Sequence, residues 1–543
     1  MRAWQRLMGV SICVCILAAC GGGTDSPLVG GGNRDGSSGN GTGTSTLQPF
    51  AVLAQQCAPD NPYTADASAP TTPASLTVEK QWVRSYMDYA YLWYDQVPTV
   101  DASAAAYSGA MTQLDYSGVP LPLSNYFDAL RTLTLTASGK RLDQFSFTYP
   151  TLAWKQLSQS GVTAGYGIEW SDLADAPPRS WRVAIVQPGS PAAVAGLMRG
   201  DVLASVDGVD FANGSDVTTL NNGLLPVAGA THTLVFTRAG NVVPIVASMT
   251  ASANVVIDPV PVATVLNGAT GKIGYLHFTD HIASSEAKLI AAVNSFKAQG
   301  ITDLVLDLRY NGGGFLYIAD ELAYMIAGPD RVSGKFFEML AFNAKRTADN
   351  AEAATPFATT SCILDASFNC TSTQPLPTLN LGRVYVIAQD STCSASEAII
   401  NGLSGVDVQV FLIGSTTCGK PYGFTAHDNC GVSYFPIEFK GVNYKGFGDY
   451  ADGFSPVAAN PGNANLLGCP AVDDVSHPLG NTLEHMLAIT LRYVADGTCL
   501  PPGGVAMPAT LAAAHRMASA ATVGSPLSAR IRQNGWLLPN GRR

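Results

Sequence analysis

The chain has 543 residues, of which 47% are hydrophobic, and a formal net charge of −10 at pH 7. Its length exceeds what one hydrophobic core supports, so we expect several domains. The acidic balance gives no electrostatic reason to expect binding to nucleic acid, and we exclude that class.

The first residues have the composition of an export signal. Arg2 and Arg6 precede a short apolar segment, residues 7–16, which cannot span a bilayer as a mature helix. The sequence LAAC that ends at Cys20 resembles a bacterial lipobox. This resemblance implies a lipoprotein signal peptide over residues 1–19 and lipidation of Cys20. A plain secretory signal with a chance cysteine is the alternative.

Residues 20–47 are rich in glycine and serine and predict a tether that buries no core. Gly21 rather than aspartate follows Cys20, and by resemblance to sorted lipoproteins this favours the outer membrane. We therefore expect a chain in the cell envelope of a Gram-negative bacterium. A lipid on Cys20 would anchor it there, facing the periplasm or the cell surface.

Eight further cysteines lie in the exported part, where disulfides persist. None has CxxC spacing, so we expect no zinc site and no other metal. The short-loop pairings are Cys362 with Cys370, Cys418 with Cys430, and Cys469 with Cys499, although many other connectivities stay open.

Residues 48–160 predict a small helical N-terminal domain. Four aromatic residues recur there at helical spacing: Trp82, Tyr86, Tyr89 and Trp93. Such a stripe is more typical of a helix core than of a ligand site. A second helix is predicted over residues 125–133.

Residues 163–252 contain short β runs around a short helix. The segment from Ser190 to Gly208 resembles a PDZ domain, in which a helix, a Gly-Asp turn and a β-hairpin follow in this order. PDZ domains bind peptide C-termini by adding a strand to a sheet edge, and a glycine-containing loop holds the terminal carboxylate. The resemblance places that loop at Gly165, Tyr166, Gly167 and Ile168. A PDZ fold used only for packing is the alternative.

Residues 268–496 alternate between strand and helix patterns, which predicts an α/β domain. We expect strands at 272–278, 302–310, 383–389 and 408–414, and helices at 285–300 and 397–405. Residues 497–543 contain no acidic residue and predict a solvated tail.

The turn STCSASE, residues 391–397, follows one of these strands and leads into a helix. Serine there is either an ordinary helix cap or a nucleophile with a nearby base. The motifs G-x-S-x-G and H-E-x-x-H are absent. Lys420 follows the next strand, and the carboxyl ends of adjacent parallel strands lie about 4.8 Å apart. Burial would have to lower the lysine pKa from about 10.4 to roughly 7 to 8 for it to act as a base.

Two glycine-containing stretches offer further chemistry. Residues 414–420 match a phosphate loop, but Pro421 stands where Ser or Thr must bind magnesium, so we reject a nucleotide site. Glycines 312–314 follow a predicted buried strand. They are either a plain turn or a source of backbone N–H donors for an oxyanion.

The order of the PDZ-like segment, DLRYNGGG (307–314), SASE (394–397) and Gly419-Lys420 is similar to that in the carboxyl-terminal processing (tail-specific) serine proteases. This resemblance implies a multidomain α/β and α+β protein with a ClpP/crotonase-like protease domain. It makes Ser394 the nucleophile and Lys420 the general base. Gly313 and Ala395 would form the oxyanion hole, and Ser396 and Glu397 would support the turn.

The sequence departs from the family pattern near the predicted base. Phe424 stands where the family has a glutamine that orients the lysine, and Cys418 replaces a phenylalanine. The spacing from serine to lysine is one residue longer. His427 or Asp428 could take over the orienting role.

We therefore expect a lipid-anchored serine endopeptidase that captures proteins with free, apolar C-termini and needs no cofactor. Two alternatives stay open. One is a PDZ peptide-binding scaffold whose protease domain has decayed, and the other is an acyl hydrolase of small substrates.

Overall fold

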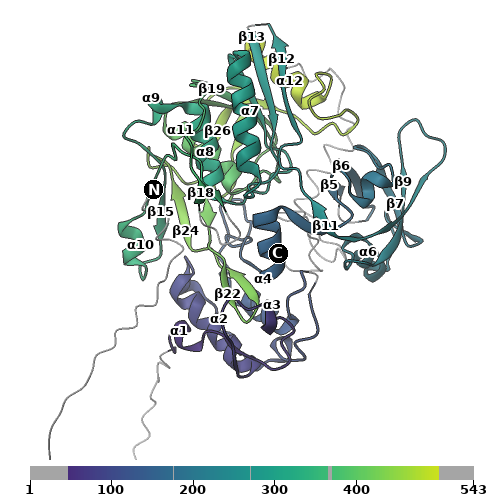
Figure 1. The fold of residues 1–543 in the computed structure, drawn as a ribbon, viewed down its shortest axis with the longest axis vertical. Coiled ribbons are helices and arrows are strands. Elements are labelled where there is room, and N and C mark those ends of the chain that lie inside the picture. Colours follow the sequence, from purple (N-terminus) through teal and green to yellow (C-terminus); the bar gives the residue numbers. More distant parts are fainter. Residues whose placement is uncertain (1–46, 116, 175–176, 270, 365–369, 500–543) are drawn as a thin grey trace, which may run out of the picture. The chain divides into compact units, whose positions relative to one another are not determined.

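The computed structural model describes residues 47–115, 117–174, 177–269, 271–364 and 370–499 (Figure 1). The predicted signal peptide, Cys20 and almost the whole predicted tether lie outside these residues, as does the C-terminal tail beyond Cys499. Within the described ranges, no helix has the length and apolar character needed to cross a bilayer.

Most regular elements of the N-terminal segment, residues 47–160, are helices. Its helices are α1 (Phe50–Leu53), α2 (Leu76–Ala90), α3 (Leu121–Ala129) and α4 (Thr151–Lys155), with short helical turns at Thr64–Asp66, Tyr94–Gln96, Ala105–Tyr107 and Gln156–Ser160. Its strands are β1 (Gln56–Cys57), β2 (Thr72–Pro73) and β3 (Phe147–Pro150).

The predicted aromatic stripe is only partly correct. Trp82 and Tyr86 are buried on α2, but Tyr89 is 40% exposed and Trp93 lies beyond the helix. The helix ends at Ala90 because the next residues turn away, and the Leu92 N–H donates to the Ile437 carbonyl.

The second helix begins earlier than predicted, at Leu121. Pro122 occupies its second position, where a fixed φ and a missing N–H cost nothing.

The β domain, residues 162–256, contains an antiparallel sheet in the order β10-β9-β7-β6-β5, with β8 paired to β7. Its elements are β4 (Val162–Gly165), β5 (Ile168–Ala174), β6 (Ser180–Val186), α5 (Pro191–Val194), β7 (Val202–Val206), β8 (Val209–Asp210), α6 (Val217–Leu224), β9 (Thr231–Thr237), β10 (Ile245–Thr250) and β11 (Ser252–Val256). The predicted order of helix, Gly-Asp turn and hairpin is present, because α5, residues 200–201 and the β7–β8 hairpin follow one another.

The α/β domain, residues 262–496, is built on a seven-stranded sheet in the order β12-β13-β14-β19-β20-β26-β25. Its strands are β12 (Val262–Gly268), β13 (Gly271–His277), β14 (Asp303–Asp307), β19 (Arg383–Ala388), β20 (Gln409–Gly414), β25 (Ser455–Val457) and β26 (Asn465–Pro470). All neighbours pair in parallel except β12 and β13. The predicted strands therefore form one sheet, with β19 beside β20.

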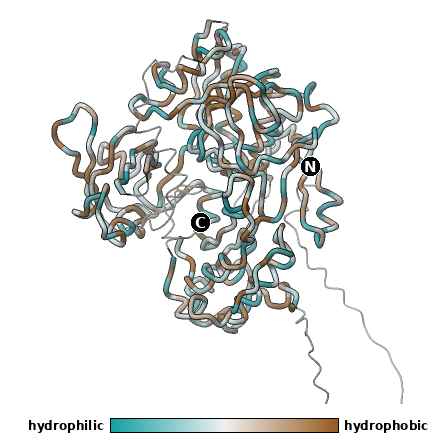
Figure 2. The backbone as a smooth tube through the Cα atoms, turned by 180° about the vertical axis from the view of Figure 1, so that it is seen from behind, coloured by the Kyte–Doolittle hydropathy of each residue, from teal (hydrophilic) through white to brown (hydrophobic). Residues whose placement is uncertain are grey.

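Helices and smaller sheets complete this domain. The helices are α7 (Ser285–Gln299), α8 (Leu316–Ala327), α9 (Pro329–Val332), α10 (Thr347–Ala351), α11 (Ala395–Gly405) and α12 (His485–Asp496). The other strands are β15 (Phe336–Phe342), β16 (Ala354–Pro356), β17 (Ile363–Leu364), β18 (Cys370–Ser372), β21 (Tyr422–Gly423), β22 (His427–Asn429), β23 (Val432–Phe435) and β24 (Phe439–Val442). Figure 2 shows hydrophobic segments running through these elements and hydrophilic ones in many connecting loops.

The N-terminal segment and the α/β domain share structure. Strand β3 pairs with β23, so residues far apart in the sequence form one sheet. Trp82 and Tyr86 of α2 also share a hydrophobic cluster with Cys393, Cys418 and Tyr434. The predicted N-terminal domain is therefore packed into the α/β domain rather than separate from it.

Four disulfides join the described cysteines. The predicted pairs Cys362–Cys370 and Cys469–Cys499 are confirmed. The predicted Cys418–Cys430 pair is wrong: Cys430 bonds to Cys57 and Cys418 to Cys393. Spacing along the chain missed this because β3 and α2 bring the N-terminal segment against the β22–β23 turn.

The Cys57–Cys430 disulfide should contribute more to stability than Cys362–Cys370, because their sequence separations are 373 and 8. In the chain-entropy model the long closure stabilises by about 6 kcal/mol and the short one by about 2 to 3 kcal/mol. We expect Cys57→Ser/Cys430→Ser to lower the urea unfolding midpoint more than Cys362→Ser/Cys370→Ser does. Equal midpoints for the two double variants would contradict this assignment.

Candidate active site

Ser394 lies at the turn between β19 and α11, as the sequence predicts. Its φ of 56° and ψ of −118° are rare for a residue with a side chain and cost backbone strain. The turn is held on both sides: the Cys393 N–H donates to the Asn311 carbonyl (3.1 Å), and the Ser394 N–H donates to Glu397 Oε2 (3.1 Å). Local hydrogen bonds therefore maintain the strained turn at Ser394.

Glu397 connects this turn to the loop that carries Lys420. Its Oε2 also accepts from the Lys420 N–H (2.8 Å), and its Oε1 accepts from the Gly419 N–H (2.9 Å) and Thr417 Oγ1 (2.5 Å). Burial raises the pKa of the Glu397 carboxyl, while these hydrogen bonds act in the opposite direction. One carboxylate thus fixes the backbones of Ser394 and Lys420 relative to each other.

Lys420 is 2% exposed, and aromatic rings surround its ammonium group. Its Nζ lies 4.2 Å from the ring centre of Phe424 and 5.4 Å from that of Phe145. Burial lowers the pKa of Lys420 to about 7, although the carboxylates of Asp143 and Glu397 oppose this shift. The neutral amine that a general base requires is therefore accessible near neutral pH.

Ser394 and Lys420 are close neighbours without a direct hydrogen bond. No hydrogen bond between Ser394 Oγ and Lys420 Nζ occurs among the described residues, although Glu397 holds both backbones. Such contacts are often long before a substrate is bound. Glu397 therefore brings the two backbones together.

Gly313 contacts the serine turn directly. A Cβ on Gly313 would lie 2.8 Å from Ser394 Cβ and 3.0 Å from the Ala395 nitrogen, and its φ is +101°. No other residue fits there. The Gly313 N–H donates to Asn311 Oδ1 (3.0 Å), and Ala395 occupies the first position of α11, where helix N–H groups have no intrahelical partner.

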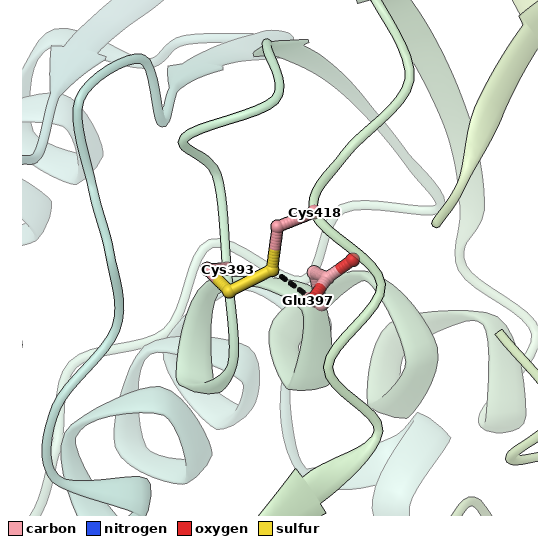
Figure 3. A group of neighbouring side chains, drawn as sticks. All are labelled: Cys393, Glu397 and Cys418. Carbon is pink, nitrogen blue, oxygen red and sulfur yellow. Dashed lines mark hydrogen bonds between the residues drawn. A yellow bond between two sulfur atoms is a disulfide. The ribbon is translucent and has the colours of Figure 1, made fainter. Parts of the chain in front are cut away.

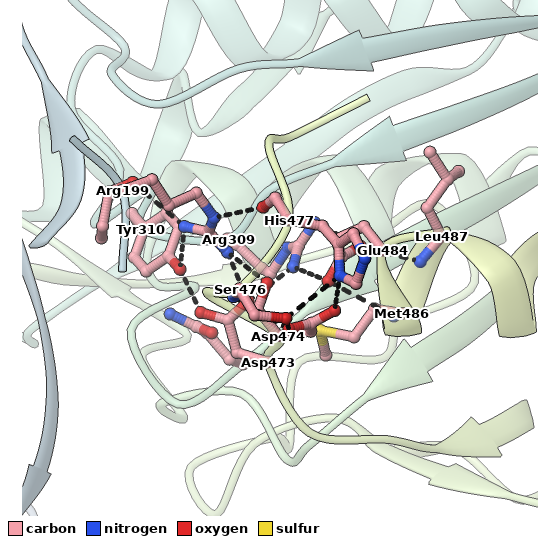
Figure 4. Close-up of polar contacts among 12 residues, drawn as sticks. Arg199, Arg309, Tyr310, Asp473, Asp474, Ser476, His477, Glu484, Met486 and Leu487 are labelled. Carbon is pink, nitrogen blue, oxygen red and sulfur yellow. Dashed lines mark hydrogen bonds and ion pairs between the residues drawn. The ribbon is translucent and has the colours of Figure 1, made fainter. Parts of the chain in front are cut away.

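Buried ion pairs surround Arg309, which precedes the glycine loop in the sequence (Figure 4). Arg309 is fully buried and contacts Asp307 (2.6 Å), Asp473 (2.7 Å) and Glu484 (2.9 Å). Burial opposes ionisation of Asp307, but Arg309 outweighs it and lowers the carboxyl pKa to about 2. Arg199 of the β domain also reaches this cluster, through Asp473 (2.8 Å).

Cys393, Glu397 and Cys418 lie together and superficially resemble a metal-ligand set (Figure 3). Cys393 and Cys418 form a disulfide, so neither sulfur is available as a thiolate ligand. Cys418 Sγ lies 3.3 Å from Glu397 Oε2 but carries no proton to donate. The disulfide instead links the residue before Ser394 to the loop that carries Lys420.

The other predicted residues lie in different places. Ser396 Oγ donates to the Asn311 carbonyl (3.2 Å), which connects the serine turn to the glycine loop. His427 stacks on Tyr86 of α2, with ring centres 4.4 Å apart. No hydrogen bond or ion pair joins His427 to Lys420 in the described part of the chain, so the structure gives no support to an orienting role for it.

The predicted peptide loop lies in the β domain. Residues Gly165, Tyr166 and Gly167 link β4 to β5, which begins at Ile168. The Tyr166 carbonyl accepts from the Ala192 N–H (3.0 Å), and the Gly167 carbonyl accepts from the Gln187 N–H (2.8 Å). Strand β5 is at an edge of its sheet.

Sequence reasoning missed the contribution of the N-terminal segment to this site. Asp143 is fully buried and accepts hydrogen bonds from Tyr91 Oη (2.6 Å) and Ser146 Oγ (2.7 Å). The ring of Phe145 faces Lys420 Nζ. No motif marks these residues, because they precede Lys420 by hundreds of positions and only tertiary packing brings them together.

The chain is similar in sequence to a known peptidase family and to several of its proteins. Residues 272–428 match the model described as peptidase family S41. A carboxyl-terminal-processing protease from Picosynechococcus sp. is 28% identical over 177 residues, which are 31% of this chain and 39% of that protein. A chloroplastic C-terminal processing peptidase from Tetradesmus obliquus is 30% identical over 215 residues, 37% of this chain and 44% of that protein. The matches thus span less than half of each relative.

A solved structure supports the fold. The crystal structure of a putative S41 protease from Bacteroides fragilis covers 79% of this chain and 99% of its own, with a TM-score of 0.55 at 24% identity. The multidomain α/β architecture expected from the sequence is therefore confirmed.

Replacing Lys420 by methionine should stabilise the fold in a pH-dependent way. The native pKa is about 7 and the unfolded value about 10.4, so between these values the unfolded chain binds more protons than the native one. The lysine therefore costs stability below about pH 7, and this cost disappears as the pH rises toward about 10.

We expect the free energy of unfolding of Lys420→Met to exceed that of the wild type by at most about 5 kcal/mol near pH 6, with the difference shrinking toward pH 10. Urea unfolding across this range measures it, with Lys297→Met as the control for removal of an exposed lysine. A constant difference between wild type and Lys420→Met would contradict the lowered pKa.

Proposed function

We propose that this chain, whose residues 272–428 match peptidase family S41, is a serine endopeptidase with Ser394 as nucleophile and Lys420 as general base. The observation that carries the proposal is the shared carboxylate of Glu397, which holds a buried lysine and a strained serine side by side.

The proposed reaction is acyl transfer in two stages. Neutral Lys420 takes the proton from Ser394 Oγ as this oxygen attacks the carbonyl carbon of the scissile peptide. When the tetrahedral intermediate collapses, the lysine ammonium returns the proton to the leaving amine, and an ester remains on Ser394. Lys420 then deprotonates a water that attacks the ester, and the acid product leaves with Ser394 Oγ reprotonated.

The Gly313 and Ala395 N–H groups would stabilise the oxyanion of both intermediates. Because the Gly313 N–H donates to Asn311 Oδ1 in the present structure, the substrate oxygen must share or replace that acceptor. The close approach of Gly313 to Ser394 supports this role, since any side chain at position 313 would occupy the space between them.

The substrates we infer are proteins with free, apolar C-termini, bound by the β domain as a PDZ-like module. Strand β5 offers an open sheet edge for an added strand, and the loop of residues 165–168 directly precedes it. Gly167 is required in that loop, because a Cβ there would lie 2.4 Å from Ser190 Cβ. The names of the curated relatives, which refer to C-terminal processing, agree with this substrate class.

We further propose that a lipid on Cys20 anchors the enzyme in the cell envelope of a Gram-negative bacterium, at the outer membrane. The lipobox-like sequence before Cys20 and the glycine-rich stretch after it support this location. A decayed scaffold is less consistent with the site, because peptide binding alone does not require a strained serine beside a buried lysine.

Ser394→Ala and Lys420→Ala should each lower labelling by a fluorophosphonate probe and peptide hydrolysis at least about 1000-fold, because each removes one half of the acyl-transfer pair. Ser391→Ala is the matched control, since its hydroxyl lies in the same turn and only accepts from Gln389 Nε2 (3.0 Å). Circular dichroism checks that the variants fold. Labelling of folded Ser394→Ala at the wild-type rate would disprove the proposed nucleophile.

Blocking the substrate C-terminus should reduce cleavage. For two peptides of identical sequence with an apolar last residue, we expect kcat/KM to be about tenfold higher with a free carboxylate than with an amide, the effect of losing one charge-assisted hydrogen bond. Equal kcat/KM values for the two peptides would contradict capture of substrate tails and leave an endopeptidase without this preference.

A further inference from the structure

Phe424 occupies the position where the resembled family has a polar orienting side chain, and its ring faces the lysine instead. The ring centre lies 4.2 Å from Lys420 Nζ, well within the range of a cation–π interaction. Phe145, from the N-terminal segment, adds a second ring at 5.4 Å. Among the described residues, no hydrogen bond from Lys420 Nζ is present, and the two rings are the partners that face it.

We propose that Phe424 and Phe145 form an aromatic clamp that positions Lys420 and stabilises its ammonium form during the reaction. The proposal rests on the proposed function, in which Lys420 is the base. Phe424 and Phe145 are positioning residues here, since they act through the lysine.

The clamp favours the transition state over the resting state. An aromatic face attracts an ammonium and has little effect on a neutral amine. In the active form of the site Lys420 is neutral and becomes an ammonium as it takes the proton from Ser394 Oγ, so the attraction increases while the barrier is being crossed. It thereby offsets part of the desolvation that burial imposes on the same charge.

Both rings are held in place by their own neighbours. Phe424 packs edge-on against Phe147 (5.5 Å) and Phe435 (5.4 Å), and these two rings stack on each other at 4.3 Å. The Phe145 N–H donates to the buried carboxylate of Asp143 (3.1 Å). The lysine therefore meets a preformed aromatic surface rather than two mobile side chains.

The charged groups that act on Lys420 are Asp143 and Glu397, and both favour its protonated form. Each carboxylate has its own hydrogen-bond donors, Tyr91 and Ser146 for Asp143, and Thr417 and Gly419 for Glu397. Replacing Phe424 leaves both carboxylates and all four donors in place. A change in the lysine pKa on such a replacement therefore reports the ring.

The test compares Phe424→Leu, which removes the ring, with Phe424→Tyr, which keeps it. Phe411→Leu is the control, because it removes a partly buried ring from a different cluster, where Phe411 stacks on Tyr385 (5.0 Å). Two readouts are taken: the pH dependence of kcat, and the pKa of Lys420 from competitive acetylation with acetic anhydride followed by mass spectrometry. The second readout needs no catalysis.

We expect Phe424→Leu to lower the Lys420 pKa by about half a unit to one unit, because the ammonium loses its partner. We also expect it to reduce kcat about tenfold with little change in KM, since the loss falls on the transition state. Phe424→Tyr should retain both values. Phe411→Leu should lower the melting temperature without moving the pKa of Lys420.

A Lys420 pKa that is the same in Phe424→Leu, Phe411→Leu and wild type would overturn the clamp and leave Phe424 as a packing residue. This outcome is distinct from failure of the proposed function. If the wild type hydrolyses no peptide and takes up no fluorophosphonate, the serine–lysine reaction fails, while the acetylation pKa still decides whether the rings hold the ammonium.

Discussion

The carboxylate of Glu397 is the constraint on which the candidate site depends. It accepts hydrogen bonds from the N–H groups of Ser394, Gly419 and Lys420 and from the Thr417 hydroxyl, all within a fully buried environment. A buried carboxylate without such donors would be costly, so the serine turn and the lysine loop must both be in place for it to be satisfied. The Cys393–Cys418 disulfide joins the same two segments covalently. The hydrogen bonds of Glu397 and the disulfide therefore both fix the separation of the Ser394 and Lys420 backbones.

The N-terminal segment packs against the candidate site and contributes to its structure. Strand β3 extends the sheet of β22 and β23, the Cys57–Cys430 disulfide secures the turn between those strands, and Phe145 reaches Lys420. Lysine at the base position must be shielded from water to lose its proton near neutral pH, and the α/β domain alone supplies only part of that shield. The aromatic residues of α2 therefore matter to the site indirectly, because they fill the core on which Cys393 and Cys418 rest.

Sequence analysis predicted the elements that depend on the local pattern of residues. The strand patterns before Ser394 and Lys420, the parallel neighbours β19 and β20, and the glycine loop all follow from periodicity and motif order. Sequence analysis did not predict the features that depend on long-range packing. These are the partner of Cys418, the end of α2, and the position of residues 143–145 near Lys420. His427 illustrates the limit, since its nearness to Lys420 along the chain allowed an orienting role, and the structure stacks its ring on Tyr86. Nothing in the local sequence distinguishes these two environments.

The two departures from the family pattern are related in the structure. Cys418 and Phe424 both flank Lys420 and are the positions at which the sequence departs from the pattern of the family that it resembles. Here the loop is held by a disulfide at one end and by ring packing at the other, so the lysine needs no polar partner of its own. A polar side chain that orients the lysine would hold the ammonium through a directional hydrogen bond. When the amine is neutral, that buried polar group would need another hydrogen-bond partner. Aromatic faces have no such requirement. They therefore suit a base that must be neutral before it accepts the proton and charged while it holds it.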